Sequence, residues 1–205
     1  MQILSINPDN PQKRLIRLVV EKLEDGAVIA YPTDTIYGLG CDIHNKGAIE
    51  RLYRIKGKDT NKPLSFLCSG MKEISSYTQV GNKNFKIINS LIPGPYTFIL
   101  EPSRTVPKIM LNKRKQIGVR VPDNNICRAL IEELGNPIIT TGVRNPEDEL
   151  FNDAEEIAGR LKGLVDIVID GGRIVPNHST IIDLTGNEPS LIREGKGDSS
   201  FLLED

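Results

Sequence analysis

The chain has 205 residues, of which 39% are hydrophobic and 26% are charged, and its formal net charge is −1. This balance is typical of a soluble globular protein, and the length fits one large domain, although length alone does not exclude two small ones. No apolar run approaches the roughly 18 residues that a membrane-spanning helix needs, and no charged-then-apolar leader opens the sequence, so we expect a cytoplasmic protein with no membrane partner.

The first predicted elements are a helix over residues 15–23, closed by Gly26, and a buried strand over the apolar run 27–30. The sequence Thr-Asp-Thr follows this strand, and strand ends are where open α/β sheets bind ligands. Thr33 and Thr35 are therefore candidate binding residues. The alternative is a turn in which these hydroxyls only satisfy their own backbone.

A second helix is predicted over residues 48–55, and two lysines follow it around Gly57. Side chains two residues apart in extended backbone point the same way, so Lys56 and Lys58 could face one anion. The alternative is that both lysines only complement the negative end of the helix dipole.

The rest of the chain alternates between helical and strand patterns, which indicates an α/β fold. Further strands are predicted over 64–68, 97–100, 117–122, 138–141, 165–169, 181–184 and 190–194, and further helices over 83–92, 125–134 and 152–161. In the strand 117–122, alternation places Val119 and Val121 on one face and Arg120 on the other, where it faces either solvent or a cleft. The basic segment 106–115 is interpreted as a loop that covers the cleft.

The three cysteines form no C-x-x-C pair, and the two histidines belong to no metal-binding motif. We therefore expect neither a disulfide framework nor a dedicated metal site, and Cys68 is interpreted as a buried small hydrophobe. Mg²⁺ carried by a nucleotide needs few protein ligands and stays compatible with this composition. Ser179 follows His178 directly, but adjacent residues rarely reach nucleophile-to-base geometry, so a serine hydrolase is not expected.

The sequence also lacks the G-x-x-x-x-G-K-[ST] loop of P-loop kinases and the G-x-G-x-x-G of Rossmann dehydrogenases. What remains is a set of Lys, Arg, Ser and Thr side chains near strand ends. Such groups suit nucleotidyl transfer, in which the protein aligns the reactants and neutralises phosphate charge.

Eight sequence blocks, in order, resemble those of the threonylcarbamoyl-AMP synthase family, also called the YrdC/YciO family. The blocks are Tyr31–Gly40, Ile55–Lys58, Asn61–Leu64, Pro93–Thr97, Val119–Pro122, Asp170–Gly172, Ser179–Asp183 and Ile192–Gly195. The match covers about residues 12–195. The resemblance implies a single YrdC-like domain over residues 1–205, with a twisted mixed β-sheet flanked by helices around a basic concave cleft.

The family's reaction joins L-threonine, bicarbonate or CO₂, and ATP, with Mg²⁺ on the nucleotide. The products are threonylcarbamoyl-AMP, which supplies a modified adenosine in tRNA, and pyrophosphate. By resemblance, Thr33 and Thr35 contact threonine and Arg120 lies near its carboxylate. The residues expected to cradle the phosphates and nucleotide are Lys56, Lys58, Thr141, Ser179 and Arg193, and the two lysines are the expected catalytic cations. Ser179 has the alternative of capping the start of a strand.

Two departures from the family pattern point to its YciO-like branch. Lys58 stands where the family usually has Arg, which keeps the charge but loses the planar fork. Thr141 and Val143 stand where the synthases usually have Ser and Asn, and valine offers no side-chain hydrogen bond. The alternative function is therefore a relative with weak or no synthase activity that binds nucleotide, double-stranded RNA or tRNA. A related transferase acting on another substrate also remains open.

Overall fold

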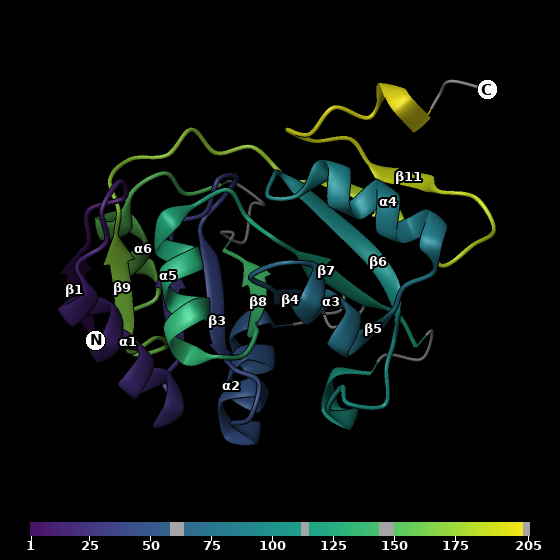
Figure 1. The fold of residues 1–205 in the computed structure, drawn as a ribbon. Helices are drawn as coiled ribbons and strands as arrows, with labels where there is room; N and C mark the ends of the chain where they lie inside the picture. The colour runs from purple at the N-terminus through teal and green to yellow at the C-terminus, as the bar shows by residue number, and fades with distance from the viewer. Residues whose placement is uncertain (58–63, 112–114, 144–149, 203–205) are drawn as a thin grey trace.

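The computed structural model describes residues 1–57, 64–111, 115–143 and 150–202. Figure 1 shows a twisted sheet with helices packed against it. The strands are β1 (Gln2–Ser5), β2 (Ile29–Tyr31), β3 (Gly38–Asp42), β4 (Ser65–Leu67), β5 (Thr78–Gln79), β6 (Tyr96–Pro102), β7 (Ile117–Arg120), β8 (Ile138–Gly142), β9 (Ile167–Asp170), β10 (Thr180–Asp183) and β11 (Ser190–Arg193). The helices are α1 (Lys13–Glu24), α2 (Lys46–Lys56), α3 (Met71–Tyr77), α4 (Asn82–Leu91), α5 (Asn125–Leu134) and α6 (Ala154–Arg160), with short 3₁₀ turns at Lys108–Met110 and Ser200–Leu202.

The strand order is β1-β9-β2-β3-β8-β4-β7-β6-β10-β11, and β5 pairs with β6 outside this path. The pairs β1/β9, β2/β9, β4/β7 and β6/β10 are parallel, whereas the other neighbours are antiparallel. The predicted α/β class with a mixed sheet is therefore confirmed.

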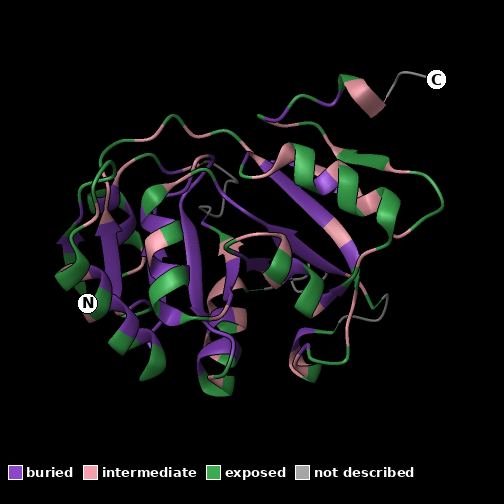
Figure 2. Cartoon of the chain, in the orientation of Figure 1, coloured by how far each residue is buried: buried purple, intermediate pink, exposed green. Residues whose placement is uncertain are grey.

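The buried hydrophobic residues form two clusters. Figure 2 shows that buried residues lie along the strands of the sheet and on parts of the helices beside it. The helices α1 and α5 pack against each other and bury one cluster, which includes Val19, Leu23 and Leu130. The other cluster receives apolar residues from α2, α3, α4 and α6, among them Leu52 and Ile157. Because each fully buried aliphatic side chain contributes about 1.5–3 kcal/mol, these clusters hold the strand ends in fixed positions.

Local signals explain the helix ends well. The helix α5 covers the predicted residues 125–134, because Asn124 caps its first turn by accepting a hydrogen bond from Cys127 N, and Gly135 ends it at φ +73°. The helix α2 begins two residues before the predicted start, because the side chain of Asn45 caps it.

The segment 31–40 differs from the sequence-based expectation, because β2 and β3 form an antiparallel pair around the Thr-Asp-Thr turn. The two glycines of β3 allow this close approach. A Cβ added at Gly38 would lie 2.9 Å from the ring of Tyr31, and one at Gly40 would lie 2.6 Å from the side chain of Ile138. The sequence analysis also missed β1, α3 and β5.

The expectation that residues 106–115 cover the cleft is wrong for their described part. This segment follows the end of β6 and leads into the start of β7, whereas Arg120 is the last residue of β7 and Thr97 lies near the start of β6. The segment therefore lies at the opposite end of these strands, and Val106 and Met110 are buried in the core. Among the described helices, none is long and apolar enough to cross a membrane.

Candidate functional site

The turn between β2 and β3 holds Thr33, Asp34 and Thr35 in a compact hydrogen-bonded arrangement. The hydroxyl of Thr33 accepts hydrogen bonds from Thr35 N (3.1 Å) and Ile36 N (3.3 Å), and it lies 2.7 Å from Ile36 O, to which it donates. The hydroxyl oxygens of Thr33 and Thr35 are 3.1 Å apart. Both threonines are buried, so in this conformation the hydroxyl of Thr33 serves the turn itself.

Asp34, at the centre of this turn, forms an ion pair with Arg120 at the end of β7. Only 9% of the Asp34 side chain and 10% of the Arg120 side chain are exposed. Among the described residues, the buried atoms Asp34 Oδ2 and Arg120 Nε have no hydrogen-bond partner. Arg120 therefore does not face solvent. Its guanidinium is paired with a carboxylate of the protein itself.

Cys127 lies beside this pair, at the start of α5. Its thiol donates a hydrogen bond to Pro32 O at 3.2 Å. Burial raises the pKa of Cys127 well above its usual value, and the nearby charge of Arg120 offsets this only in part. The thiol therefore stays protonated at neutral pH and is a packing residue. Cys68 is also fully buried, as predicted.

A second polar cluster surrounds Ser179 at the start of β10. The hydroxyl oxygens of Ser179 and Thr97 lie 2.8 Å apart and share a hydrogen bond. Arg193 donates to Ser179 O from Nε (3.1 Å) and Nη2 (2.8 Å), and Nη2 also lies 3.2 Å from Ser179 Oγ. Two of the predicted phosphate-binding residues therefore meet directly, and Thr97, which ends the family block Pro93–Thr97 but was given no role, joins them.

Lys196 joins the two clusters. Its backbone N–H donates to His178 O at 2.7 Å, next to Ser179, and its ammonium donates to Asp34 O at 2.7 Å. Asn177 N also donates to Thr35 O at 3.0 Å. Five predicted site residues thus belong to one contiguous network: Thr33, Thr35, Arg120, Ser179 and Arg193. Lys196 was missed, and its only sequence signal is its position directly after the Ile-Arg-Glu-Gly block.

Thr141 lies on β8, and Val143 directly follows this strand. Thr141 is half-buried and pairs with Leu39, and Val143 N donates to Tyr37 O at 2.9 Å. Val143 is only 2% exposed and belongs to a hydrophobic cluster. The position at which the synthases usually carry Asn is therefore part of the core in this chain.

The structure describes only one of the two predicted lysines. Lys56 is the last residue of α2 and is half-buried. Lys58 and Asn145, the residue considered as a substitute for the family's Asn, lie outside the described residues. The two-lysine arrangement thus stays a prediction.

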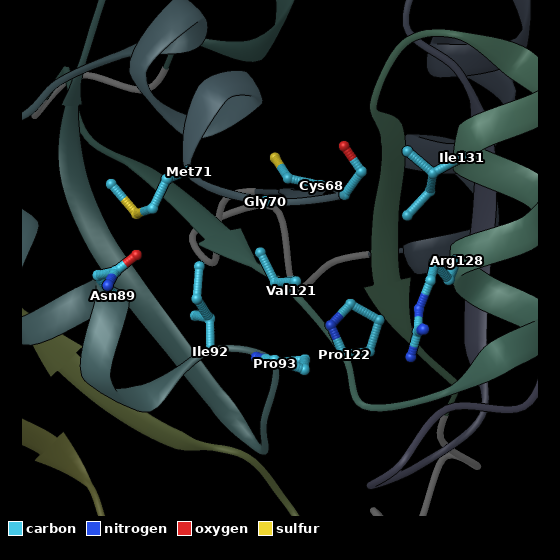
Figure 3. Close-up of a pocket in the computed structure, with 11 residues that line it drawn as sticks. Cys68, Gly70, Met71, Asn89, Ile92, Pro93, Val121, Pro122, Arg128 and Ile131 are labelled. Atoms are coloured by element: carbon cyan, nitrogen blue, oxygen red, sulfur yellow. The ribbon is translucent and has the colours of Figure 1, made fainter.

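A separate cavity of about 400 Å³ lies between α5 and the pair α3/α4, where β4 and β7 end (Figure 3). Its wall is largely apolar, with Met71, Val121 and Pro122 among the lining residues and Arg128 at one side. Val121 directly follows Arg120, but none of the predicted site residues lines this cavity. The cavity is therefore a neighbour of the Asp34 network and not part of it.

The network suits an anionic ligand better than a bare metal ion. Among the described residues, no group of three or more His, Cys, Asp or Glu side chains is placed to hold a metal. The one carboxylate of the network, Asp34, is already bound by Arg120.

The chain is similar to proteins of one known family. A family model named Sua5_yciO_yrdC and described as "Telomere recombination" matches residues 21–195. YciO of Escherichia coli strain K12 is 44% identical over 204 residues, which are 98% of this chain and 99% of that protein. A putative threonylcarbamoyl-AMP synthase of Methanocaldococcus jannaschii is 32% identical over 196 residues, which are 95% of this chain and 92% of that protein.

Two solved structures are closely similar. The crystal structure of E. coli YciO has a TM-score of 0.93 and covers 96% of this chain and 97% of its own. The crystal structure of Pyrococcus abyssi Sua5 complexed with L-threonine has a TM-score of 0.88 at 26% identity, and it covers 95% of this chain but only 58% of its own. The resemblance and its YciO-like character are thereby confirmed.

Proposed function

The chain belongs to the Sua5/YciO/YrdC family, and from that premise we propose that it is a cytoplasmic threonylcarbamoyl-AMP synthase that uses L-threonine, bicarbonate or CO₂, and ATP. A carbamate forms on the threonine nitrogen, and one of its oxygens attacks the α-phosphorus of ATP. The bond from that phosphorus to the bridging oxygen breaks, and pyrophosphate leaves. The product would serve threonylcarbamoylation of tRNA adenosine.

The observation that carries this proposal is the convergence of three cations on one turn and strand end. Arg120 and Lys196 both contact Asp34, and Arg193 contacts Ser179. Phosphoryl-type transfers depend on positioning and charge neutralisation, which such a group of cations and hydroxyls can provide without a covalent nucleophile. The similarity to Sua5, whose structure holds L-threonine, supports threonine as the amino acid.

In this proposal the two clusters have different roles. Arg120 receives the threonine carboxylate, which then shares the guanidinium with Asp34, and Thr33 and Thr35 shape the turn that faces the amino acid. Ser179 and Arg193 bind the nucleotide, and Thr141 adds a hydroxyl from β8. Lys56 and Lys58 would neutralise the developing charge on the phosphates, and Mg²⁺ carried by the nucleotide would supply further positive charge there.

A second function is favoured by one specific observation. Val143 is buried in the core, so the side-chain hydrogen bond that Asn usually supplies in the synthases is missing at this position. A relative that binds nucleotide or double-stranded RNA with little synthase activity would tolerate this loss. The 44% identity to YciO is compatible with that alternative.

The deciding experiment incubates the protein with ¹⁴C-labelled threonine, ATP, bicarbonate and Mg²⁺, and separates the adenylate by chromatography. Synthesis that is lost in Lys56→Ala but kept in Lys86→Ala, a change at an exposed lysine on α4, supports the synthase. If the wild type forms no adenylate but binds double-stranded RNA with an affinity that falls steeply with salt, the synthase function is wrong and the binding function is favoured.

A further inference from the structure

Lys196 has a defined position, because both its backbone N–H and its ammonium form hydrogen bonds, but its ammonium has no carboxylate partner among the described residues. It is exposed, and among the described residues its ammonium donates a hydrogen bond to the backbone carbonyl of Asp34 alone. An ammonium has three N–H donors, so two remain after this contact. A carbonyl oxygen carries no net charge, and Lys196 forms no ion pair with any residue in the described ranges. No carboxylate of the described residues therefore lies within ion-pair distance of this ammonium.

The backbone around Lys196 is built for close approach to Ser179. Gly195 packs so tightly that an added Cβ would lie 2.4 Å from His178 O and 2.6 Å from the carbonyl carbon of Ser179. The next residue, Lys196, binds His178 O through its N–H. Figure 1 shows the chain leaving β11 and running toward the middle of the molecule before it turns to the C-terminus. The sequence thus brings Lys196 to a fixed place between Asp34 and Ser179.

The local charge balance favours an anionic ligand at this place. The carboxylate of Asp34 pairs with Arg120, and Arg193 is a further cation that lies beside Ser179. The ammonium of Lys196 lies on the backbone carbonyl of Asp34. The hydroxyls of Ser179 and Thr97 can donate to anionic oxygens in the same region. Several fixed cations with nearby hydroxyls are the chemistry that recognises phosphate.

We propose that the ammonium of Lys196 binds the phosphate chain of the nucleotide and is a further substrate-binding residue of this site. Its ligand class is a polyphosphate, either the β- and γ-phosphates of a nucleoside triphosphate or free pyrophosphate. The inference rests on the proposed function for the identity of the nucleotide.

The test uses isothermal titration calorimetry of the full chain with inorganic pyrophosphate, ATP, adenosine and L-threonine, each in the presence of Mg²⁺. Lys196→Met should weaken pyrophosphate and ATP about tenfold or more, the loss expected for one charge-assisted hydrogen bond. Adenosine and threonine should bind as in the wild type. Lys196→Arg should keep most of the affinity, and Lys162→Met, at another exposed lysine, is the matched control.

The outcomes separate this inference from the proposed function. Equal pyrophosphate affinity in wild type and Lys196→Met overturns the inference, even if the wild type makes the adenylate. An equal loss for threonine and ATP, with a lowered urea midpoint, also overturns it, because a purely structural tether would act in that way. Wild-type protein that binds neither ATP nor pyrophosphate overturns it too. Pyrophosphate binding that depends on Lys196, without adenylate formation by the wild type, would support the inference and contradict the proposed synthase function.

Discussion

Asp34 and Arg120 are 86 residues apart in sequence, yet they form an ion pair in which about nine-tenths of each side chain is buried. The pair ties the turn after β2 to the end of β7. A buried charge whose partner is removed keeps its desolvation cost without the compensating attraction, so the pair makes the fold sensitive to loss of either member.

Asp34→Asn should therefore lower the free energy of unfolding by about 3–5 kcal/mol, because the guanidinium of Arg120 would stay buried without its counter-charge. Urea denaturation at pH 7 measures this. Removing the arginine as well, in Asp34→Asn/Arg120→Met, should recover part of the loss.

The control for this change is the exposed pair of Arg17 and Glu133, in which 66% and 39% of the side chains are exposed. Arg17→Ala should cost only about 0–1 kcal/mol, because solvent screens surface pairs. If Asp34→Asn cost no more than this surface variant, the buried pair would not be an anchor of the fold.

Asp166 should make stability depend on pH in the acid range. Arg51 binds its carboxylate from Nη1 (2.6 Å) and Nη2 (3.1 Å), and Val28 N donates to Oδ2 at 2.8 Å. Partial burial raises the pKa of Asp166, but these hydrogen bonds and the charge of Arg51 outweigh it, so the net pKa is lowered. A group with a lowered folded pKa stabilises the protein above its unfolded pKa and loses that effect as the pH falls through its folded pKa.

Wild-type protein should therefore be more stable than Asp166→Asn at pH 7, and this gap should narrow as the pH falls below about 4, the region of the unfolded pKa. Urea midpoints of both proteins at pH 7 and in acid give the gap directly. Other carboxylates titrate in both proteins, so they cancel in the difference. A gap of constant size across this range would refute the role given to the Arg51 contacts.

Gly195→Ala should disturb the site through the backbone. The added methyl group would meet His178 O and Ser179 backbone atoms at 2.4–2.7 Å, and backbone cannot move aside cheaply. We expect a loss of about 1–3 kcal/mol in the free energy of unfolding, as in overpacked cores. ATP affinity should fall as well, because Lys196 is displaced.

Gly159→Ala, inside α6, is the matched glycine variant because its added Cβ meets nothing within 4 Å. It should leave ATP affinity unchanged and should stabilise the helix by about 0.5–1 kcal/mol. Calorimetry and urea denaturation of both variants compare the two cases. Wild-type affinity and stability in Gly195→Ala would mean that the contact with Ser179 is loose.

Val143→Asn tests whether the residue usual in the synthases can simply be restored. Val143 is 2% exposed within a hydrophobic cluster, so an amide there is buried among apolar groups. We expect a destabilisation of about 1–3 kcal/mol and no gain in adenylate formation. Thermal unfolding and the labelled-threonine assay on the same preparation check both points. A stable variant with higher activity would show that this side chain can reach the ligand.

The parts of the fold that could be predicted are those with local signals. Residues 125–134 were predicted to their ends because Asn124 and Gly135 mark both termini of α5. The strand β3 could not be predicted in the same way, because glycine usually weakens a strand and β3 contains both Gly38 and Gly40. The reason for glycine at these two positions is seen only in the structure, where the ring of Tyr31 and the side chain of Ile138 leave no room for a Cβ atom.

The site shows the same division. Alternation in β7 correctly separated Arg120 from Val119, but a sequence pattern cannot say which carboxylate will lie opposite an arginine. The family blocks pointed to Ser179 and Arg193, which do meet. Lys196 lies just beyond the last block, and its contact with Asp34 depends on the path of the chain after β11.

The attachment of Lys196 to Asp34 spans 162 residues. Contacts between such distant positions form late, since closing a long loop costs entropy before the contact can stabilise it. During synthesis, the turn after β2 therefore leaves the ribosome long before Lys196, the second cation that contacts Asp34. An unfinished chain has only part of this cation set, so the polyphosphate binding proposed for the site would require the complete chain.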